Sequence, residues 1–268
     1  MARQIIESPP SVAPWLQGLG GPTAQRLLAW EQAQADACLA DVFGYHAVQA
    51  GWPGFDTLRH NRMPHRWLAQ QEFDDEGAPP PHLSFDSRAW PWAAESVDLV
   101  VLPHTLERSA DPHACLREVE RVLIPEGQVF ITGINPWSLW GLKLGRDQKS
   151  ACPPGQGDWP VQPIGPHRLR DWLHLLGFEV QLQRFTGWTP AWRSERWVQR
   201  WSWLDALGRR WCPIVGGAYL IVATKRVPGG LLMKGRAWRK VPSRSAMVAP
   251  AASIEAPLRA SPKPESLS

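Results

Sequence analysis

A strand-helix-strand pattern near the middle of the sequence limits the possible folds more than any other feature. The apolar run Val97–Leu102 is rich in β-branched residues and is typical of a strand buried on both faces of a parallel sheet. Pro112–Leu123 follows with helical apolar spacing, and Asp111 before it is a natural N-cap. A turn at Pro125–Gly127 then leads into a second predicted strand, Gln128–Thr132. This order predicts a right-handed βαβ unit.

Other segments extend this unit into a larger domain. Pro22–Cys38 has the apolar spacing of a helix, and Pro166–Leu176 predicts another helix that ends at Gly177. Phe178–Arg184 and Ala218–Thr224 predict two further strands. The economical α/β architecture is a mostly parallel sheet with helices on both faces. Such sheets bind ligands at the carboxyl ends of their strands.

Charge divides the chain into two unequal parts. The net charge is +4, but residues 228–268 alone carry seven basic and two acidic side chains. Residues 1–227 then hold 22 basic and 23 acidic side chains, a net charge of −1. Because the last part is rich in proline, alanine and serine, we predict a basic disordered tail at 228–268 after a domain at 1–227. A basic tail suits nucleic acid or anionic lipid, and a solvated extension without a partner is the simpler alternative.

Other patterns limit the location and the chemistry. No apolar run approaches the roughly 20 residues that span a bilayer. Met1–Pro14 lacks the apolar core of a secretory signal, so we expect a cytoplasmic protein. The cysteines stand at positions 38, 115, 152 and 212, without a CxxC pair, so we expect free thiols and no metal site.

Residues 84–132 carry a more specific pattern. It reads Ser84-Phe85-Asp86-Ser87, Trp90-Pro91-Trp92, His104-Thr105-Leu106-Glu107, Asp111-Pro112, Leu116-Arg117-Glu118, Arg121-Val122-Leu123, Pro125 and Gly127. This pattern closely resembles the class I S-adenosylmethionine-dependent methyltransferases, in particular the type 11 methyltransferase domain. The resemblance is strong over about 50 residues and loose over about 180. It implies a Rossmann-like methyltransferase sheet.

The resemblance also implies a cofactor and the residues that contact it. S-adenosyl-L-methionine is the methyl donor of the family, and an acidic residue after the third strand accepts a hydrogen bond from its adenine amino group. Asp86 corresponds to that residue, with Ser87 beside it; a simple turn or N-cap is the plainer alternative for Asp86. Pro103 and His104, after the fourth strand, correspond to the lining of the donor site. His104 would orient the acceptor, act as a base, or only pack beneath the donor.

Two regions depart from the family pattern. The glycine-rich loop after the first strand corresponds best to Ala40–Gly51, where Gly44 is the glycine expected to contact the donor. Tyr45 and His46 stand where small residues are usual. The acidic residue that holds the ribose has no counterpart in Leu58–Trp67, a basic stretch that suits an anionic acceptor or a solvated surface. Either donor binding is retained, which the later pattern favours, or the protein is a non-catalytic binding or scaffold protein.

A tryptophan- and arginine-rich insertion at about 187–213 precedes the last predicted strand. It holds six of the 17 tryptophans and five arginines. Trp197, Trp201 and Trp211 share one helical face, which suits peripheral contact with the inner face of a membrane, or a cap that packs onto the domain. We therefore expect a bacterial-type methyltransferase with a small-molecule or lipid-like acceptor, and we do not expect nucleic acid as its partner.

Overall fold

The structure is a computed structural model, and it describes residues 14–51, 55–71, 83–151, 162–191, 196, 200 and 203–227. The chain divides into two units, Met1–Val227 and Pro228–Ser268. The predicted disordered tail lies outside the described residues. In chain order, the elements are η1 (Pro14–Leu19), α1 (Gly21–Leu39), β1 (His46–Ala50), β2 (His65–Gln71), β3 (Leu83–Phe85), β4 (Val97–Pro103), α2 (Thr105–Arg108), α3 (Pro112–Val122), β5 (Leu123–Ile134), α4 (Leu139–Ala151), α5 (Pro166–Leu175), β6 (Phe178–Thr186), α7 (Trp203–Trp211), η2 (Pro213–Val215) and β7 (Ala218–Lys225).

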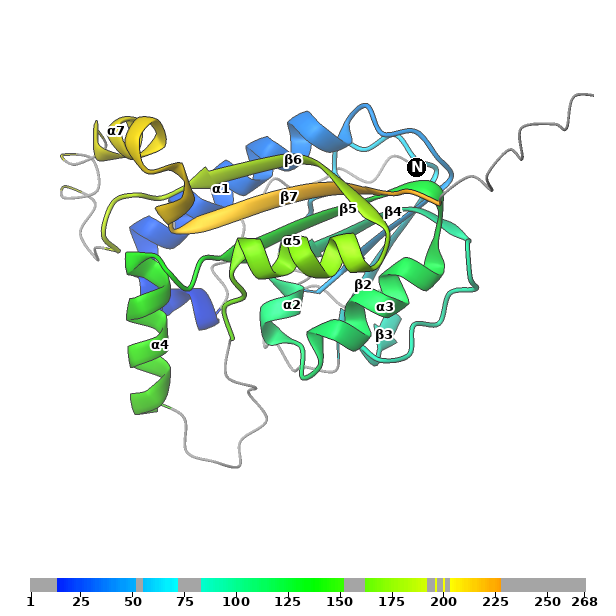
Figure 1. The fold of residues 1–268 in the computed structure, drawn as a ribbon, viewed down its shortest axis with the longest axis horizontal. Helices are drawn as coiled ribbons and strands as arrows, with labels where there is room; N and C mark the ends of the chain where they lie inside the picture. The colour runs from blue at the N-terminus through cyan, green and yellow to red at the C-terminus, as the bar shows by residue number, and fades with distance from the viewer. Residues whose placement is uncertain are drawn as a thin grey trace, which may run out of the picture. The chain divides into compact units, whose positions relative to one another are not determined.

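Seven strands form one sheet in the order β3-β2-β1-β4-β5-β7-β6 (Figure 1). β1 to β5 pair in parallel, whereas β7 runs antiparallel to both of its neighbours. β1 and β4 are adjacent, and the strand order runs outward from them in opposite directions. Their carboxyl ends therefore form the switch point at which such sheets bind ligands.

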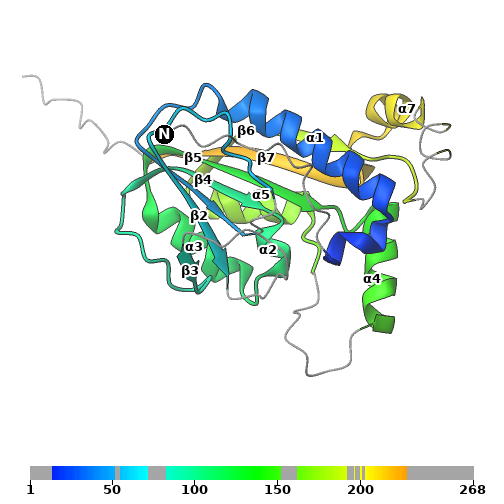
Figure 2. The same cartoon turned by 180° about the vertical axis from the view of Figure 1, so that it is seen from behind.

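Helices cover both faces of the sheet, as predicted. On one face, α3 buries Leu116 and α5 buries Leu169 in the same apolar cluster (Figure 1). On the other face, seen in Figure 2, α1 buries Ala35 and Leu39 against Phe130 of β5. Burying both faces explains why β4 is apolar apart from Asp98 and why β7 is apolar up to Thr224.

The predicted βαβ unit is confirmed by β4, α3 and β5, with one correction. The Asp111 side chain caps α3 by accepting a hydrogen bond of 3.0 Å from the Ala114 amide. The predicted turn at Pro125–Gly127 lies inside β5, where the pairing with β4 shifts its register. Glu126 takes a left-handed backbone there, with φ of 65°. The chain therefore bends within a continuous strand, as a β-bulge does.

Candidate functional site

Asp86 and His104 lie at the same edge of the sheet. Asp86 directly follows β3, and His104 directly follows Pro103, the last residue of β4. β1 to β4 pair in parallel, so their carboxyl ends all meet this edge, called the carboxyl edge below. The structure thus brings the two predicted donor-site segments to the edge that the fold class uses for ligands.

Side chains of α3 hold the turn that follows β3. The Asp86 side chain is exposed and accepts a hydrogen bond of 2.9 Å from the Arg88 amide, whereas Ser87 is buried. Glu118 accepts a hydrogen bond of 2.9 Å from the Trp90 amide. The Arg121 guanidinium donates to the Trp90 and Trp92 carbonyls at 3.1 and 3.0 Å. The exposed carboxylate is therefore presented by a fixed turn.

The sequence pattern contains Glu118 and Arg121, but it gave them no role. Their side chains also pair with each other, at 2.8 Å, and this hydrogen bond lowers the pKa of Glu118. Beneath the turn, the Trp90 ring packs edge-on against Phe85, with centroids 5.1 Å apart. Glu118 and Arg121 are three residues apart on the helix that follows the turn. This spacing is the sequence signal that could have identified their contacts with the turn, called the clamp below.

His104 is enclosed by two carboxylates. His104 is 2% exposed, Glu31 of α1 is 0% exposed and Glu107 of α2 is 2% exposed. Nε2 of His104 lies 2.8 Å from Glu31 Oε1, and Nδ1 lies 3.1 Å from Glu107 Oε2. The second oxygen of Glu107 accepts the amide hydrogen of Ile134 in β5. Nothing in the sequence pattern links Glu31 to this group, because it lies 73 residues from His104 in the chain.

The carboxylates hold His104 in its charged form. Burial alone would lower the pKa of the imidazole, but Glu31 and Glu107 outweigh it and raise that pKa to about 10. Burial also raises the pKa of Glu107. At neutral pH His104 is therefore an imidazolium, and each of its ring nitrogens faces a glutamate. Its role as a catalytic base stays a prediction.

Gly44 was predicted in the wrong loop. It precedes β1, and its backbone packs against the side chain of Asp98, at the amino edge of the sheet. Asp98 Oδ2 also accepts hydrogen bonds of 2.9 Å from the Tyr45 and His46 amides. Because these residues lie at the far edge from Asp86, they cannot form the loop that meets the donor there.

The connection that follows β1 begins instead at Gly51, whose φ is 127°. The open side of Gly51 is filled by the Thr105 hydroxyl, which donates a hydrogen bond to the Ala50 carbonyl. The end of β1 is therefore joined to the segment that follows β4. Among the described residues of this connection, 51 and 55–64, the structure has no helix.

The basic stretch Leu58–Trp67 was also assigned to the wrong edge. It leads into β2 at the amino edge, where Arg59 pairs with Asp36 of α1. This position separates the stretch from Asp86 and His104, and an anionic acceptor at that stretch stays a prediction. β2 ends at Gln71, and Glu72 is the next residue in the sequence, outside the described part. An acidic residue therefore does follow β2 in the sequence.

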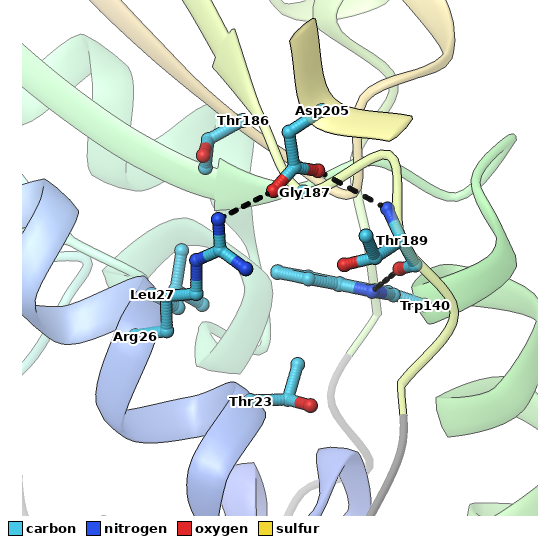
Figure 3. Close-up of a pocket in the computed structure, with 8 residues that line it drawn as sticks. All are labelled: Thr23, Arg26, Leu27, Trp140, Thr186, Gly187, Thr189 and Asp205. Atoms are coloured by element: carbon cyan, nitrogen blue, oxygen red, sulfur yellow. Dashed lines mark hydrogen bonds and ion pairs between the residues drawn. The ribbon is translucent and has the colours of Figure 1, made fainter. Parts of the chain in front are cut away.

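A pocket lies farther along the carboxyl edge, among α1, α4, the end of β6 and α7 (Figure 3). Its lining residues are Thr23, Arg26, Leu27, Trp140, Thr186, Gly187, Thr189 and Asp205. Arg26 pairs with Asp205 at 2.8 Å, and Asp205 accepts the Thr189 amide hydrogen at 3.3 Å. The Trp140 indole donates a hydrogen bond of 2.7 Å to the Thr189 carbonyl. These contacts fix the start of the insertion against α1 and α4.

The insertion begins at the carboxyl edge, because β6 ends there at Thr186. Of the three tryptophans predicted to contact a membrane, Trp211 is 74% exposed, and Trp197 and Trp201 lie outside the described residues. Trp188 instead packs inward, and its indole donates a hydrogen bond of 2.8 Å to the Cys212 carbonyl. The described part of the insertion therefore contains one tryptophan that anchors it and others that face solvent.

The described residues contain neither a metal-binding cluster nor a membrane-spanning helix. No group of three or more histidine, cysteine, aspartate or glutamate side chains there could hold a metal ion. No described helix combines the length and the apolar character needed to cross a membrane. Cys38, Cys115 and Cys212 are free thiols.

Comparisons with known proteins agree with this geometry. Residues 65–131, from β2 to β5, match the family model described as a methyltransferase domain. A curated relative, the uncharacterized protein YafS of Escherichia coli K12, is 40% identical over 102 residues. That match covers 38% of this chain and 40% of the relative, so it spans about two-fifths of the relative's length.

Solved structures share the fold at low sequence identity. A methyltransferase from Thermotoga maritima matches with a TM-score of 0.53 and 16% identity, over 79% of this chain and 93% of that one. An S-adenosylmethionine-dependent methyltransferase from Mesorhizobium loti matches with a TM-score of 0.50 and 14% identity, over 74% and 97%. One from Archaeoglobus fulgidus matches with a TM-score of 0.50 and 17% identity, over 74% and 94%. The chain therefore has the fold of S-adenosylmethionine-dependent methyltransferases, and its residues 65–131 are similar to the methyltransferase domain.

Proposed function

We propose that this protein transfers a methyl group from S-adenosylmethionine to a small-molecule or lipid-like acceptor. The observation that carries the proposal is the exposed carboxylate of Asp86, at the end of β3 and within the segment that matches the methyltransferase model. A carboxylate only accepts hydrogen bonds, so it suits the amino group of adenine. The methylated atom and the identity of the acceptor are open.

The residues at the carboxyl edge fit the two ends of this donor. Asp86 and Ser87 would hold the adenine, on a turn that Arg121 already fixes before binding. At the end of β4, Glu31 Oε2 is buried and has no hydrogen-bond partner among the described residues. An unpaired buried carboxylate oxygen is costly, and a cationic group beside it would offset that cost. A donor that carries a sulfonium and an ammonium group has this chemistry.

The chain's own residues would position the donor and the acceptor rather than activate them. The bound donor supplies a methyl group already activated on a sulfonium, so alignment of donor and acceptor supplies much of the rate. Pro103 and His104 would bound the donor site, and the charged His104 side chain would orient Glu31. In this proposal His104 takes no proton from the acceptor, since both of its nitrogens face carboxylates.

A second candidate is a non-catalytic, methyltransferase-like binding protein. The Thr105 hydroxyl fills the open side of Gly51, so this glycine leaves no space there for a ligand. The described residues of the connection from β1 to β2 also contain no helix whose N-terminus could bind a carboxylate. Donor binding separates the two candidates.

The test of the donor site is the variant Asp86→Ala, titrated with S-adenosylhomocysteine in a calorimeter. We expect a loss of about tenfold or more in affinity, because a hydrogen bond to a charged group contributes about 1.5–3 kcal/mol. Asp171→Ala is the matched control, since Asp171 is also an exposed aspartate and lies on α5. Equal affinities for the two variants would show that Asp86 does not hold the adenine.

A further inference from the structure

We propose that the protein docks onto an anionic lipid bilayer through the apolar face of α7 and η2. This docking face consists of Trp203, Leu207, Trp211, Ile214 and Val215, all exposed. The inference deepens the proposed function and rests on it in one respect: the acceptor enters at the edge from which α7 projects. It uses only residues of the insertion that the structure describes.

The apolar face points away from the body because the opposite side of α7 is attached. Asp205 pairs with Arg26 of α1, Gly208 packs against the Trp188 ring, and the Cys212 carbonyl accepts the Trp188 indole hydrogen. Asp205 and Gly208 are three residues apart, so they share one side of the helix, and Cys212 directly follows the end of the helix. Trp203, Leu207 and Trp211 are spaced by four residues and form the other side. Trp203 and Trp211 on this other side are 55% and 74% exposed, while the first side holds the helix in place.

Most of the described charged residues of the insertion are arginines. Arg196, Arg200 and Arg210 are exposed. Asp205 is the one acidic residue among the described positions between 187 and 217, and Arg26 pairs with it. Arg210 comes directly before Trp211, so a cationic residue adjoins an aromatic one in the sequence at the end of α7.

An apolar face bordered by arginine matches the interface of an anionic bilayer. Tryptophan rings favour the boundary between headgroups and acyl chains, and arginines near the surface are attracted to anionic lipids. A second copy of this chain would present the same positive charge, so the two copies would repel each other. The charge pattern thus favours the lipid surface over self-association.

The docking face also lies close to the carboxyl edge of the sheet. α7 contacts the pocket at the carboxyl edge through Asp205, at the side of the sheet where β6 ends (Figure 3). A bilayer in contact with α7 would therefore lie beside this edge. A lipid-like acceptor could then reach the site without leaving the membrane surface.

The test is co-sedimentation of the full chain with vesicles. Phosphatidylcholine vesicles are compared with vesicles that also contain phosphatidylglycerol, at low and high salt. We expect binding to the anionic vesicles that weakens with salt, and about a tenfold or greater loss in the variant W203A/W211A. Trp67→Ala is the matched control, because Trp67 is 41% exposed and lies in β2, outside the docking face. It should bind like the wild type.

Three results would overturn the docking proposal. The first is no binding to anionic vesicles at low salt, and the second is an equal loss in the control and in W203A/W211A. The third is a wild-type dimer, seen by light scattering without vesicles, that W203A/W211A converts to a monomer. S-adenosylhomocysteine affinity is measured on the same proteins, and we expect W203A/W211A to leave it unchanged. Vesicle binding without any ligand binding would end the proposed function and leave the docking result standing.

Discussion

His104 carries a positive charge inside the protein because its two carboxylate neighbours outweigh the cost of its burial. Its folded pKa of about 10 exceeds the ordinary value of about 6.5 expected in the unfolded chain. A group with a raised folded pKa stabilises the protein fully below its unfolded pKa. That contribution is lost as the pH rises through the folded pKa. The relevant window is therefore about pH 6.5 to 10.

This window gives a prediction for stability. Between pH 7 and pH 9.5 the free energy of unfolding should fall by about 3 kcal/mol through His104. His104→Gln should lose about 3–5 kcal/mol at pH 7, since it leaves Glu31 and Glu107 without their cation, and should lack this pH dependence. Urea unfolding of the wild type and of His104→Gln at the two pH values measures these differences in the free energy of unfolding. A variant that matches the wild type at pH 7 would refute the charged cluster.

Among the secondary-structure elements, those with a regular apolar pattern were predicted well and the short polar ones were not. β4 is a nearly continuous apolar run, and α3 has a clear apolar period and a capping residue, so their boundaries follow from the sequence. β1 is five residues long and includes Gln49, which is 1% exposed. Gln49 is buried because its oxygen accepts hydrogen bonds of 2.9 and 2.6 Å from the Thr57 amide and hydroxyl. Because this buried position is polar, β1 lacks the apolar pattern that would have identified it as a strand. The donor loop was therefore predicted at Ala40–Gly51, a range that includes β1 instead of following it.

The clamp from α3 to the turn after β3 allows a prediction about stability and ligand affinity. Arg121→Ala removes the donor to the Trp90 and Trp92 carbonyls, so the turn that presents Asp86 should loosen. We expect a loss of about 1–2 kcal/mol in the free energy of unfolding and a several-fold loss in S-adenosylhomocysteine affinity. Arg117→Ala, on the exposed side of the same helix, should change neither. Calorimetric titration and urea unfolding of the two variants provide the comparison.

In the whole molecule, one edge of the sheet collects the donor-site turn, the His104 cluster and the base of the insertion. The sheet order β3-β2-β1-β4-β5-β7-β6 puts the donor side at β3 to β4 and the insertion beyond β5. The family resemblance predicted the donor side through Asp86 and His104. It could not predict Glu31 or the contact between Arg26 and Asp205, because these contacts join segments far apart in the chain.

The central claim is that the carboxyl edge binds a methyl donor. Titration calorimetry of the wild-type full chain with S-adenosylhomocysteine, and with its cationic analogue sinefungin, tests it most directly. We expect saturable 1:1 binding of both ligands, with the cationic one bound at least as tightly because Glu31 Oε2 has no hydrogen-bond partner among the described residues. The absence of heat for both ligands up to near-millimolar concentration would contradict the account and would favour the non-catalytic protein.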